Sequence, residues 1–160
     1  MKPIKVMFVC MGNICRSPTA HGIFQNLLDE AKLSSQILVE SSGTTGYHSG
    51  ESPDHRACST AIQAGVNLSS LRAQQITSKD YLEQAYILAM DCTNLSNLLC
   101  QCPDEYKEKI RLLLDYHPDK FLTEVPDPYY GGDKGFEKVF EMLQVACVEL
   151  LTKIKQNHQL

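Results

Sequence analysis

Cys10, Arg16 and Ser17 are the first residues whose types and spacing could do chemistry. They lie in the segment CMGNICRS, where five residues separate the cysteine from the arginine. A strand-like run, IKVMFVC, ends at Cys10, and a helical pattern begins just after the arginine. Free backbone N–H groups at a helix start bind anions, and the helix dipole favours negative charge there. The segment is therefore typical of a loop that wraps a phosphate group.

The side chains of this segment suit both the binding and the attack of a phosphate group. Arg16 can hold two phosphate oxygens with its planar guanidinium group. The positive field that binds the anion also favours the thiolate form of Cys10, which is the nucleophilic form of a cysteine. The Ser17 hydroxyl can hydrogen-bond that sulfur and later help it leave. Gly12 permits a tight turn, and the other loop positions are Met11, Asn13, Ile14 and Cys15.

Two simpler interpretations of the same residues stay open. Cys10 could be a buried residue at the end of a strand, with Arg16 as a surface charge. Cys10 and Cys15 could instead bind a metal ion. Zinc sites usually combine a close pair of cysteines with a second pair or with histidines, so a metal site is the weaker of the two interpretations.

Displacing an alkoxide or phenolate from phosphorus also needs a proton donor on the leaving oxygen. Asp127 is the best candidate, in the segment VPDPYYGG, where prolines on both sides stiffen the backbone. The adjacent Tyr129 and Tyr130 could form an aromatic wall. An ordinary surface turn is the alternative, because Pro, Asp and Gly are common turn residues.

Composition narrows the classes of protein. The chain has 160 residues, of which 43% are hydrophobic and 21% charged, as in ordinary globular domains. The formal net charge is −4 and no run of Lys or Arg stands out, which disfavours a nucleic-acid partner. No apolar stretch approaches the ~20 residues of a membrane span, and the start of the chain does not resemble a signal peptide. We therefore expect a cytoplasmic protein, and its seven cysteines, an odd number, argue against a disulfide framework.

Hydrophobic patterning predicts strands that alternate with helices. The expected strands are 4–10, 37–42, 86–90 and 110–114, and the expected helices are 18–31, 56–64, 93–100 and a long helix that starts after Gly135. Ser17 and Thr93 are the expected N-caps of the first and third of these helices. Such alternation indicates an α/β fold with a parallel sheet flanked by helices, here as a single domain over residues 1–160. Ligands of such sheets bind at the carboxyl ends of the strands, which is where the Cys10 loop would lie.

Several motifs, taken together and in order, resemble the low-molecular-weight protein tyrosine phosphatases over essentially the whole chain. They are VMFVCMGNICRSP, Ser41-Ser42-Gly43, Gly46-Tyr47, Ser52-Pro53-Asp54-x-Arg56-Ala57, Ala89-Met90-Asp91-x-x-Asn94-Leu95 and Asp127-Pro128-Tyr129-Tyr130. The resemblance implies a three-layer α/β fold with a four-stranded parallel sheet, no metal and no cofactor. It implies a hydrolase whose partners are proteins that contain phosphotyrosine, with phosphate and other oxyanions as inhibitors.

The resemblance also implies roles for individual residues. Cys10 would form a phosphocysteine intermediate, while Arg16 and the loop N–H groups hold the phosphoryl oxygens. Asp127 would protonate the departing tyrosine and then act as a base for the attacking water. The remaining implied roles are Asn13 as a prop of the loop, Ser42 as the hydrogen-bond partner of Asn13, Tyr47 and Tyr129 as walls of a substrate slot, and Cys15 as the redox partner of Cys10.

Leu71 and Gln74 depart from the family pattern, because many members carry His and Arg at these positions. That His usually supports the active-site loop, so we expect an altered support here. Two other functions stay open. An arsenate reductase would share the loop and relay electrons through further cysteines, for which Cys92 and Cys100 are candidates. A binding module, either an inactive phosphate reader or a redox sensor, would hold phosphotyrosine without cleaving it, but a phosphate reader needs neither a nucleophile nor a proton donor.

Overall fold

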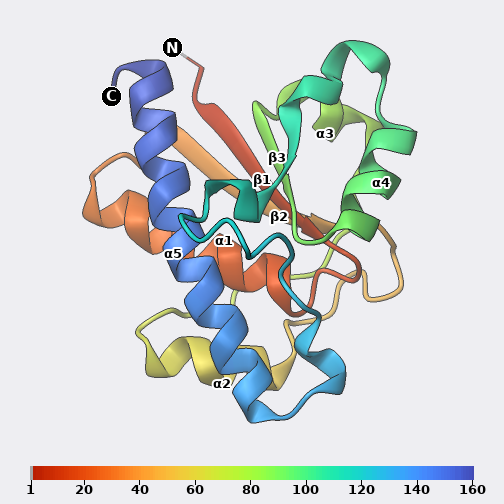
Figure 1. The fold of residues 1–160 in the computed structure, drawn as a ribbon, viewed down its shortest axis with the longest axis vertical. Coiled ribbons are helices and arrows are strands. Elements are labelled where there is room, and N and C mark those ends of the chain that lie inside the picture. Colours follow the sequence, from red (N-terminus) through yellow and green to blue (C-terminus); the bar gives the residue numbers. More distant parts are fainter. Residues whose placement is uncertain (1) are drawn as a thin grey trace.

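The computed structural model describes residues 2–160 and is centred on a parallel sheet (Figure 1). The strands are β1 (Ile4–Cys10), β2 (Ile37–Gly43), β3 (Tyr86–Ala89) and β4 (Ile110–Leu112). Their order is β2-β1-β3-β4, and every neighbouring pair is parallel. The predicted α/β fold with a four-stranded parallel sheet is therefore confirmed.

Helices cover both faces of the sheet and complete three layers (Figure 1). One layer contains α1 (Arg16–Glu30) and α5 (Asp133–His158), with α2 (His55–Gln63) packed beside both of them. The other layer contains α3 (Ser78–Glu83) and α4 (Cys92–Gln101). Short 3₁₀ segments connect these elements at η1 (Asp104–Lys109), η2 (Leu113–Tyr116) and η3 (Pro128–Tyr130).

Alternation along β1 builds the two halves of the core. Val6 and Phe8 face the α1 and α5 layer, and the Phe8 ring meets the Phe24 ring of α1 edge to face at 5.6 Å. Met7 and Val9 face the other layer, in one cluster with Leu98 of α4. All of these side chains are fully buried, so β1 is packed on both faces of the sheet. Within residues 2–160, no helix combines the length and apolar character that a membrane span requires.

Several element boundaries and helix caps differ from the predicted ones. The first helix begins at Arg16 and follows Cys15 as N-cap, so Ser17 lies in the first turn and does not cap it. Asp91 caps α4 in place of Thr93, because its carboxylate accepts a hydrogen bond from the Asn94 N–H at 2.7 Å. The last strand ends at Leu112, where the chain tightens into η2, and α5 starts two residues before Gly135.

Candidate active site

The loop from Cys10 to Arg16 joins the end of β1 to the start of α1, at the carboxyl edge of the sheet. Its carbonyl oxygens accept hydrogen bonds from neighbouring segments: Cys10 O from Thr44 N at 2.9 Å, Met11 O from Thr45 N at 3.0 Å and Ile14 O from Asp54 N at 2.8 Å. No acceptor in residues 2–160 takes a hydrogen bond from the N–H groups of Met11 through Cys15. Carbonyls held by outside partners and free N–H groups are the arrangement that binds an anion.

Asn13 holds the turn of this loop in the left-handed backbone region, with a φ of 58°. Asn tolerates that conformation better than most residues. Its side chain is 2% exposed and makes two hydrogen bonds: Nδ2 donates to Ser17 Oγ at 2.7 Å, and Oδ1 accepts from Gln74 N at 3.0 Å. Asn13 therefore ties the loop both to α1 and to the segment that follows α2.

The Cys10 sulfur lies 3.0 Å from Ser17 Oγ in a buried contact. Asn13 already donates to that hydroxyl, so the Ser17 proton is left for the sulfur or for the Ser42 carbonyl, 3.3 Å away. The predicted pairing of Ser42 with Asn13 is wrong: the Ser42 hydroxyl donates to Met7 Sδ at 3.2 Å, and its carbonyl supports Ser17. β2 places Ser42 beside Val9 of β1, which brings its carbonyl under Ser17 and turns its side chain into the sheet's other face.

Arg16 is 3% exposed and is held from one side. Its Nη1 donates to Asp91 Oδ2 at 2.7 Å and to the Val125 carbonyl at 3.0 Å, while Nη2 lies 3.7 Å from Asp127 Oδ2. Burial acts to lower the pKa of Arg16, but the negative charges of Cys10, Asp91 and Asp127 raise it above its ordinary value. The guanidinium group is thus permanently charged and fixed before any phosphate arrives.

Asp127 lies at the other side of the loop, with 32% of its side chain exposed. Its Oδ1 accepts a hydrogen bond from Tyr129 N at 3.0 Å and so caps η3, which leaves Oδ2 toward Arg16. Val125 N donates to the Met90 carbonyl at 2.8 Å and anchors this segment at the end of β3. Two strand ends, those of β1 and β3, therefore bring Cys10 and Asp127 together.

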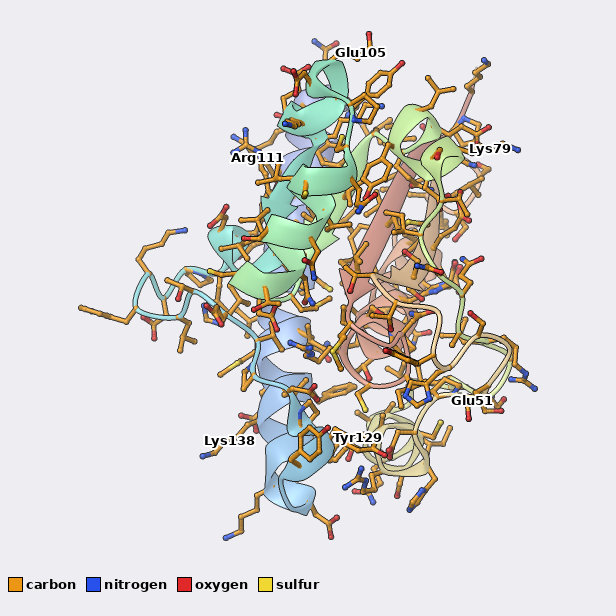
Figure 2. The ribbon with its side chains drawn as sticks, turned by 90° about the vertical axis from the view of Figure 1, so that its right-hand side faces the viewer. Glu51, Lys79, Glu105, Arg111, Tyr129 and Lys138 are labelled. Atoms are coloured by element: carbon orange, nitrogen blue, oxygen red, sulfur yellow. The ribbon has the colours of Figure 1, made fainter. Side chains whose placement is uncertain are left out.

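A hollow of about 160 Å³ joins these groups. Its lining residues are Cys10, Met11, Gly12, Ile14, Cys15, Arg16, His48, Asp127, Tyr129 and Tyr130. The Tyr129 and Tyr130 rings meet edge to face at 5.1 Å, and Figure 2 shows Tyr129 beside the start of α5. A narrow hollow with the sulfur in its lining and aromatic rings at its side can accept a phosphate group that carries a flat ring.

Tyr47 does not form the second wall that the resemblance implied. Its side chain is 86% exposed, and the neighbouring His48 lines the hollow and lies against Gly12. His48 is paired through Nδ1 with the Glu51 carboxylate, and Glu51 is labelled in Figure 2. Sequence reasoning missed His48. The only signal was its adjacency to Tyr47, and the turn that follows β2 decides which of the two faces the loop.

The departures at Leu71 and Gln74 leave the loop with a different support. Gln74 reaches it through the bond from its N–H to Asn13, and its side-chain amide donates to the Ser41 carbonyl at 3.0 Å. His21 Nδ1 lies 3.0 Å from Ser41 Oγ on the same strand end, and burial lowers its pKa to about 4. This support is built from neutral side chains. The sequence suggested that Asp91 caps the next segment and lies near the carboxyl edge of the sheet, but it did not predict the bond from Arg16 to Asp91, nor the partners of Gln74 and His21.

The cysteines other than Cys10 differ in environment. Cys15 is 6% exposed, and burial raises the pKa of its thiol. All seven cysteines are free thiols in the part of the chain that the structure describes. Cys92 and Cys100 are eight positions apart in α4, or roughly 12 Å at the rise of an α-helix, so the intact helix keeps the two thiols too far apart to pair.

Comparison with known proteins agrees with this geometry. The family model described as low molecular weight phosphotyrosine protein phosphatase matches residues 5–160. The human low molecular weight phosphotyrosine protein phosphatase is 41% identical over 154 residues, which cover 92% of this chain and 94% of the human one. The Bacillus subtilis low molecular weight protein-tyrosine-phosphatase YfkJ is 37% identical over 157 residues, 98% of this chain and 99% of its own.

Solved structures give the same result. A crystal structure of the protein tyrosine phosphatase of Entamoeba histolytica superimposes with a TM-score of 0.93 at 37% identity, over 97% of this chain and 99% of that one. The fold and the site define a hydrolase with a phosphate-binding loop that carries a cysteine. The chain belongs to the low-molecular-weight protein tyrosine phosphatase family, as the sequence motifs predicted.

Proposed function

We propose that this chain hydrolyses protein phosphotyrosine, with Cys10 as nucleophile and Asp127 as general acid and base. The observation that carries the proposal is that Cys10, Arg16 and Asp127 line one hollow, with the sulfur 3.0 Å from a hydroxyl that can donate to it. The family membership supports the same assignment.

The reaction would proceed in two displacements. The Cys10 thiolate attacks phosphorus, the S–P bond forms, and the bond to the tyrosine oxygen breaks as the protonated Asp127 carboxyl gives its proton to that oxygen. A water then attacks the phosphocysteine, gives a proton to the Asp127 carboxylate, and releases inorganic phosphate as the S–P bond breaks. Ser17 stabilises the sulfur as it leaves, since its proton can turn to the thiolate.

Arg16 and the loop N–H groups would stabilise the charge that develops on the phosphoryl oxygens. Nη1 is used by Asp91 and Val125, so Nε and Nη2 are the groups left for phosphate. Because the loop is already curled around its N–H groups, little reorganisation accompanies the reaction. Inorganic phosphate and other tetrahedral oxyanions should bind the same groups and inhibit competitively.

The substrate class follows from the hollow's walls. Tyr129 and Tyr130 give an aromatic rim, which suits the ring of phosphotyrosine better than the short side chain of phosphoserine. Closure of a disulfide between Cys10 and Cys15 would make the enzyme sensitive to oxidants, because both line the hollow. Cytoplasmic location remains a prediction from the sequence.

Hydrolysis of an aryl phosphate by wild type, Cys10→Ser and Asp127→Asn, in chelator and reductant, tests this function. Cys10→Ser should lose all turnover. Asp127→Asn should lose roughly 10²–10³-fold in kcat, the size of a general-acid contribution, while phosphate binding persists. Cys58→Ser and Asp104→Asn are matched controls outside the hollow and should keep full rate. Inactive wild type, or full activity in Cys10→Ser, would refute the mechanism.

A further inference from the structure

We propose that Arg56 is a positioning residue that holds the Tyr129 wall against the phosphate loop and so sets the preference for aryl over alkyl phosphates. The inference deepens the proposed function and rests on it. Arg56 lies in the first turn of α2, outside the set of residues that line the hollow. It would act on the substrate only through the ring that it holds.

Arg56 is itself fixed by a two-pronged bond to Asp54. Its Nε donates to Asp54 Oδ1 at 3.1 Å and its Nη2 to Asp54 Oδ2 at 3.0 Å. The same carboxylate caps α2 by accepting from the Arg56 N–H at 2.8 Å. The Arg56 side chain is 29% exposed and that of Asp54 is 9% exposed, so the pair is partly sheltered from water. The plane of the guanidinium group is therefore set by the start of the helix.

Two aromatic rings lie against this fixed guanidinium group. Its Cζ is 5.3 Å from the centre of the Tyr129 ring and 4.8 Å from the centre of the Phe136 ring of α5. Attraction between a cation and a ring face is strongest where water is partly excluded. Phe136 is 4% exposed and packs in a buried cluster with Cys15 and Ala57, whereas Tyr129 is 40% exposed and belongs to a short 3₁₀ turn. Of the two rings, Tyr129 is the one whose position depends on Arg56.

The Asp54–Arg56 pair, called the clamp below, is also attached to the phosphate loop. Asp54 N donates to the Ile14 carbonyl at 2.8 Å, and Ala57 packs with Cys15 and Phe136 in a small buried cluster. The distance between the loop and the Tyr129 wall is thus set through Asp54 and Arg56. Because the Arg56 charge is paired with Asp54, its contribution is to position the wall, and the phosphate is left to Arg16.

The position of the Tyr129 ring affects only the binding of substrates that pack against it. The ring of an aryl phosphate would pack against Tyr129, whereas a short alkyl phosphate would meet only the loop and Arg16. Loss of the clamp should therefore raise KM for aryl esters and leave KM for alkyl esters nearly unchanged. A general loss of folding stability would affect both substrates alike.

The position of the wall can be measured without any reaction, because the chain contains no tryptophan. Tyr129→Trp introduces a single fluorophore at the wall, and acrylamide quenching reports its exposure. Adding Arg56→Met should raise the quenching constant about twofold, since Met keeps the length of the side chain but loses the cation–ring attraction. Arg72→Met is the matched control: Arg72 is exposed and donates to the Ser69 and Leu71 carbonyls, away from Tyr129. It should leave the quenching unchanged.

Kinetics on the native Tyr129 background complete the test. Arg56→Met should raise KM for phenyl phosphate about fivefold and change KM for an alkyl phosphate less than about twofold, the size expected from one lost cation–ring contact. Arg56→Lys, which keeps the charge but not the fork, should fall between Met and wild type. Unchanged quenching together with unchanged KM in Arg56→Met, or equal changes for both esters, would overturn the inference. Absence of Cys10-dependent activity in wild type would refute the proposed function, and the quenching would still decide whether Arg56 holds the wall.

Discussion

At the scale of single residues, the site depends on how a buried charge is balanced. Arg16 is nearly inaccessible to water, and among residues 2–160 Asp91 is its one acidic partner at hydrogen-bond distance. The two are 75 positions apart in sequence and meet because β1 and β3 are neighbours whose ends lie at the same edge. Asp91 also caps α4, so one carboxylate orients the arginine and starts a helix.

Asp91→Asn and Asp91→Ala should separate these two roles. An asparagine side chain can still cap α4 but no longer neutralises Arg16, so we expect kcat/KM to fall about tenfold with a small change in melting temperature. Alanine should show the same kinetic loss and cost about 1 kcal/mol more in the free energy of unfolding, because the cap is gone. Chemical denaturation and steady-state kinetics on both variants measure the difference. Equal stability of the two variants would contradict the assignment of the cap.

Ser17→Ala should slow the step in which the Cys10 sulfur leaves phosphorus. The hydroxyl lies 3.0 Å from the sulfur, and no other side chain of residues 2–160 forms a hydrogen bond with that sulfur. Removing the donor should lower kcat about tenfold or more, the value of a hydrogen bond to a charged group, and leave inhibition by phosphate nearly unchanged. A burst of phenol followed by a slower steady rate would identify the step. Ser34→Ala, on the surface near the end of α1, is the control.

At the scale of elements, the end of β2 limits where the phosphate loop can lie. A Cβ atom on Gly43 would come within 2.6 Å of the Met11 carbonyl oxygen, which is backbone and cannot turn aside. A Cβ atom on Gly22, in the middle of α1, would lie 2.4 Å from Leu68 Cδ2 and 2.8 Å from Val66 Cγ1, which are side-chain atoms of the core. The two close approaches act on different parts of the molecule.

Gly43→Ala and Gly22→Ala should therefore have opposite signatures. Gly43→Ala should displace the loop and lower kcat/KM more than tenfold, since an error of about 1 Å at a reacting centre can cost two orders of magnitude. Gly22→Ala should keep its rate and lose about 1 kcal/mol of stability, the net of overpacking and better helix propensity. Kinetics beside urea unfolding distinguishes them. A fully active Gly43→Ala would show that the loop has more room than these distances allow.

The elements and the main reacting residues could be predicted from the sequence, while several supporting contacts could not. The position of the Cys10 loop follows from a rule about the carboxyl ends of parallel strands, whereas Asp127 was predicted from the proline-flanked segment VPDPYYGG; both residues line the same hollow. The second wall of the hollow could not be predicted. Tyr47 and His48 are adjacent in sequence, and only the turn after β2 decides that His48 faces the hollow. The predicted hydrogen bond between Ser42 and Asn13 also failed, because side chains alternate along β2 and the Ser42 side chain points toward Met7. Such orientations depend on contacts between distant segments.

At the scale of the whole molecule, one helix connects the active site, at the carboxyl edge of the sheet, with the opposite edge. α5 extends over 26 residues, or roughly 39 Å, from Asp133 to His158. Near its start Phe136 lies beside Arg56, and at its end His158 lies against Tyr86, at the start of β3. One long helix thus links the Tyr129 wall to the opposite edge of the sheet. Gln74 and His21 both contact Ser41 beside the loop, and burial lowers the pKa of His21 to about 4, which keeps this support neutral near pH 7.

His21 makes the stability of the whole protein depend on pH. Burial lowers its pKa from 6.5 to about 4, and the Glu40 carboxylate offsets only part of that effect. Below pH 6.5 His21 binds a proton in the unfolded chain, whereas in the folded protein it stays neutral down to a pH of about 4. The contribution of His21 is therefore complete above pH 6.5 and is lost as the pH falls toward 4, by about 2–3 kcal/mol in all.

His21→Asn should remove this dependence while keeping a polar partner for Ser41. The difference in unfolding free energy between wild type and variant, followed by urea denaturation, should shrink by about 2–3 kcal/mol as the pH falls from 7 to 4. His55→Asn is the matched control, because His55 is exposed at the start of α2. Parallel curves for the two variants would mean that His21 takes up its proton equally in the folded and unfolded chains. The histidine would then be solvated in the native state, and the support of the phosphate loop would carry a charge in acid.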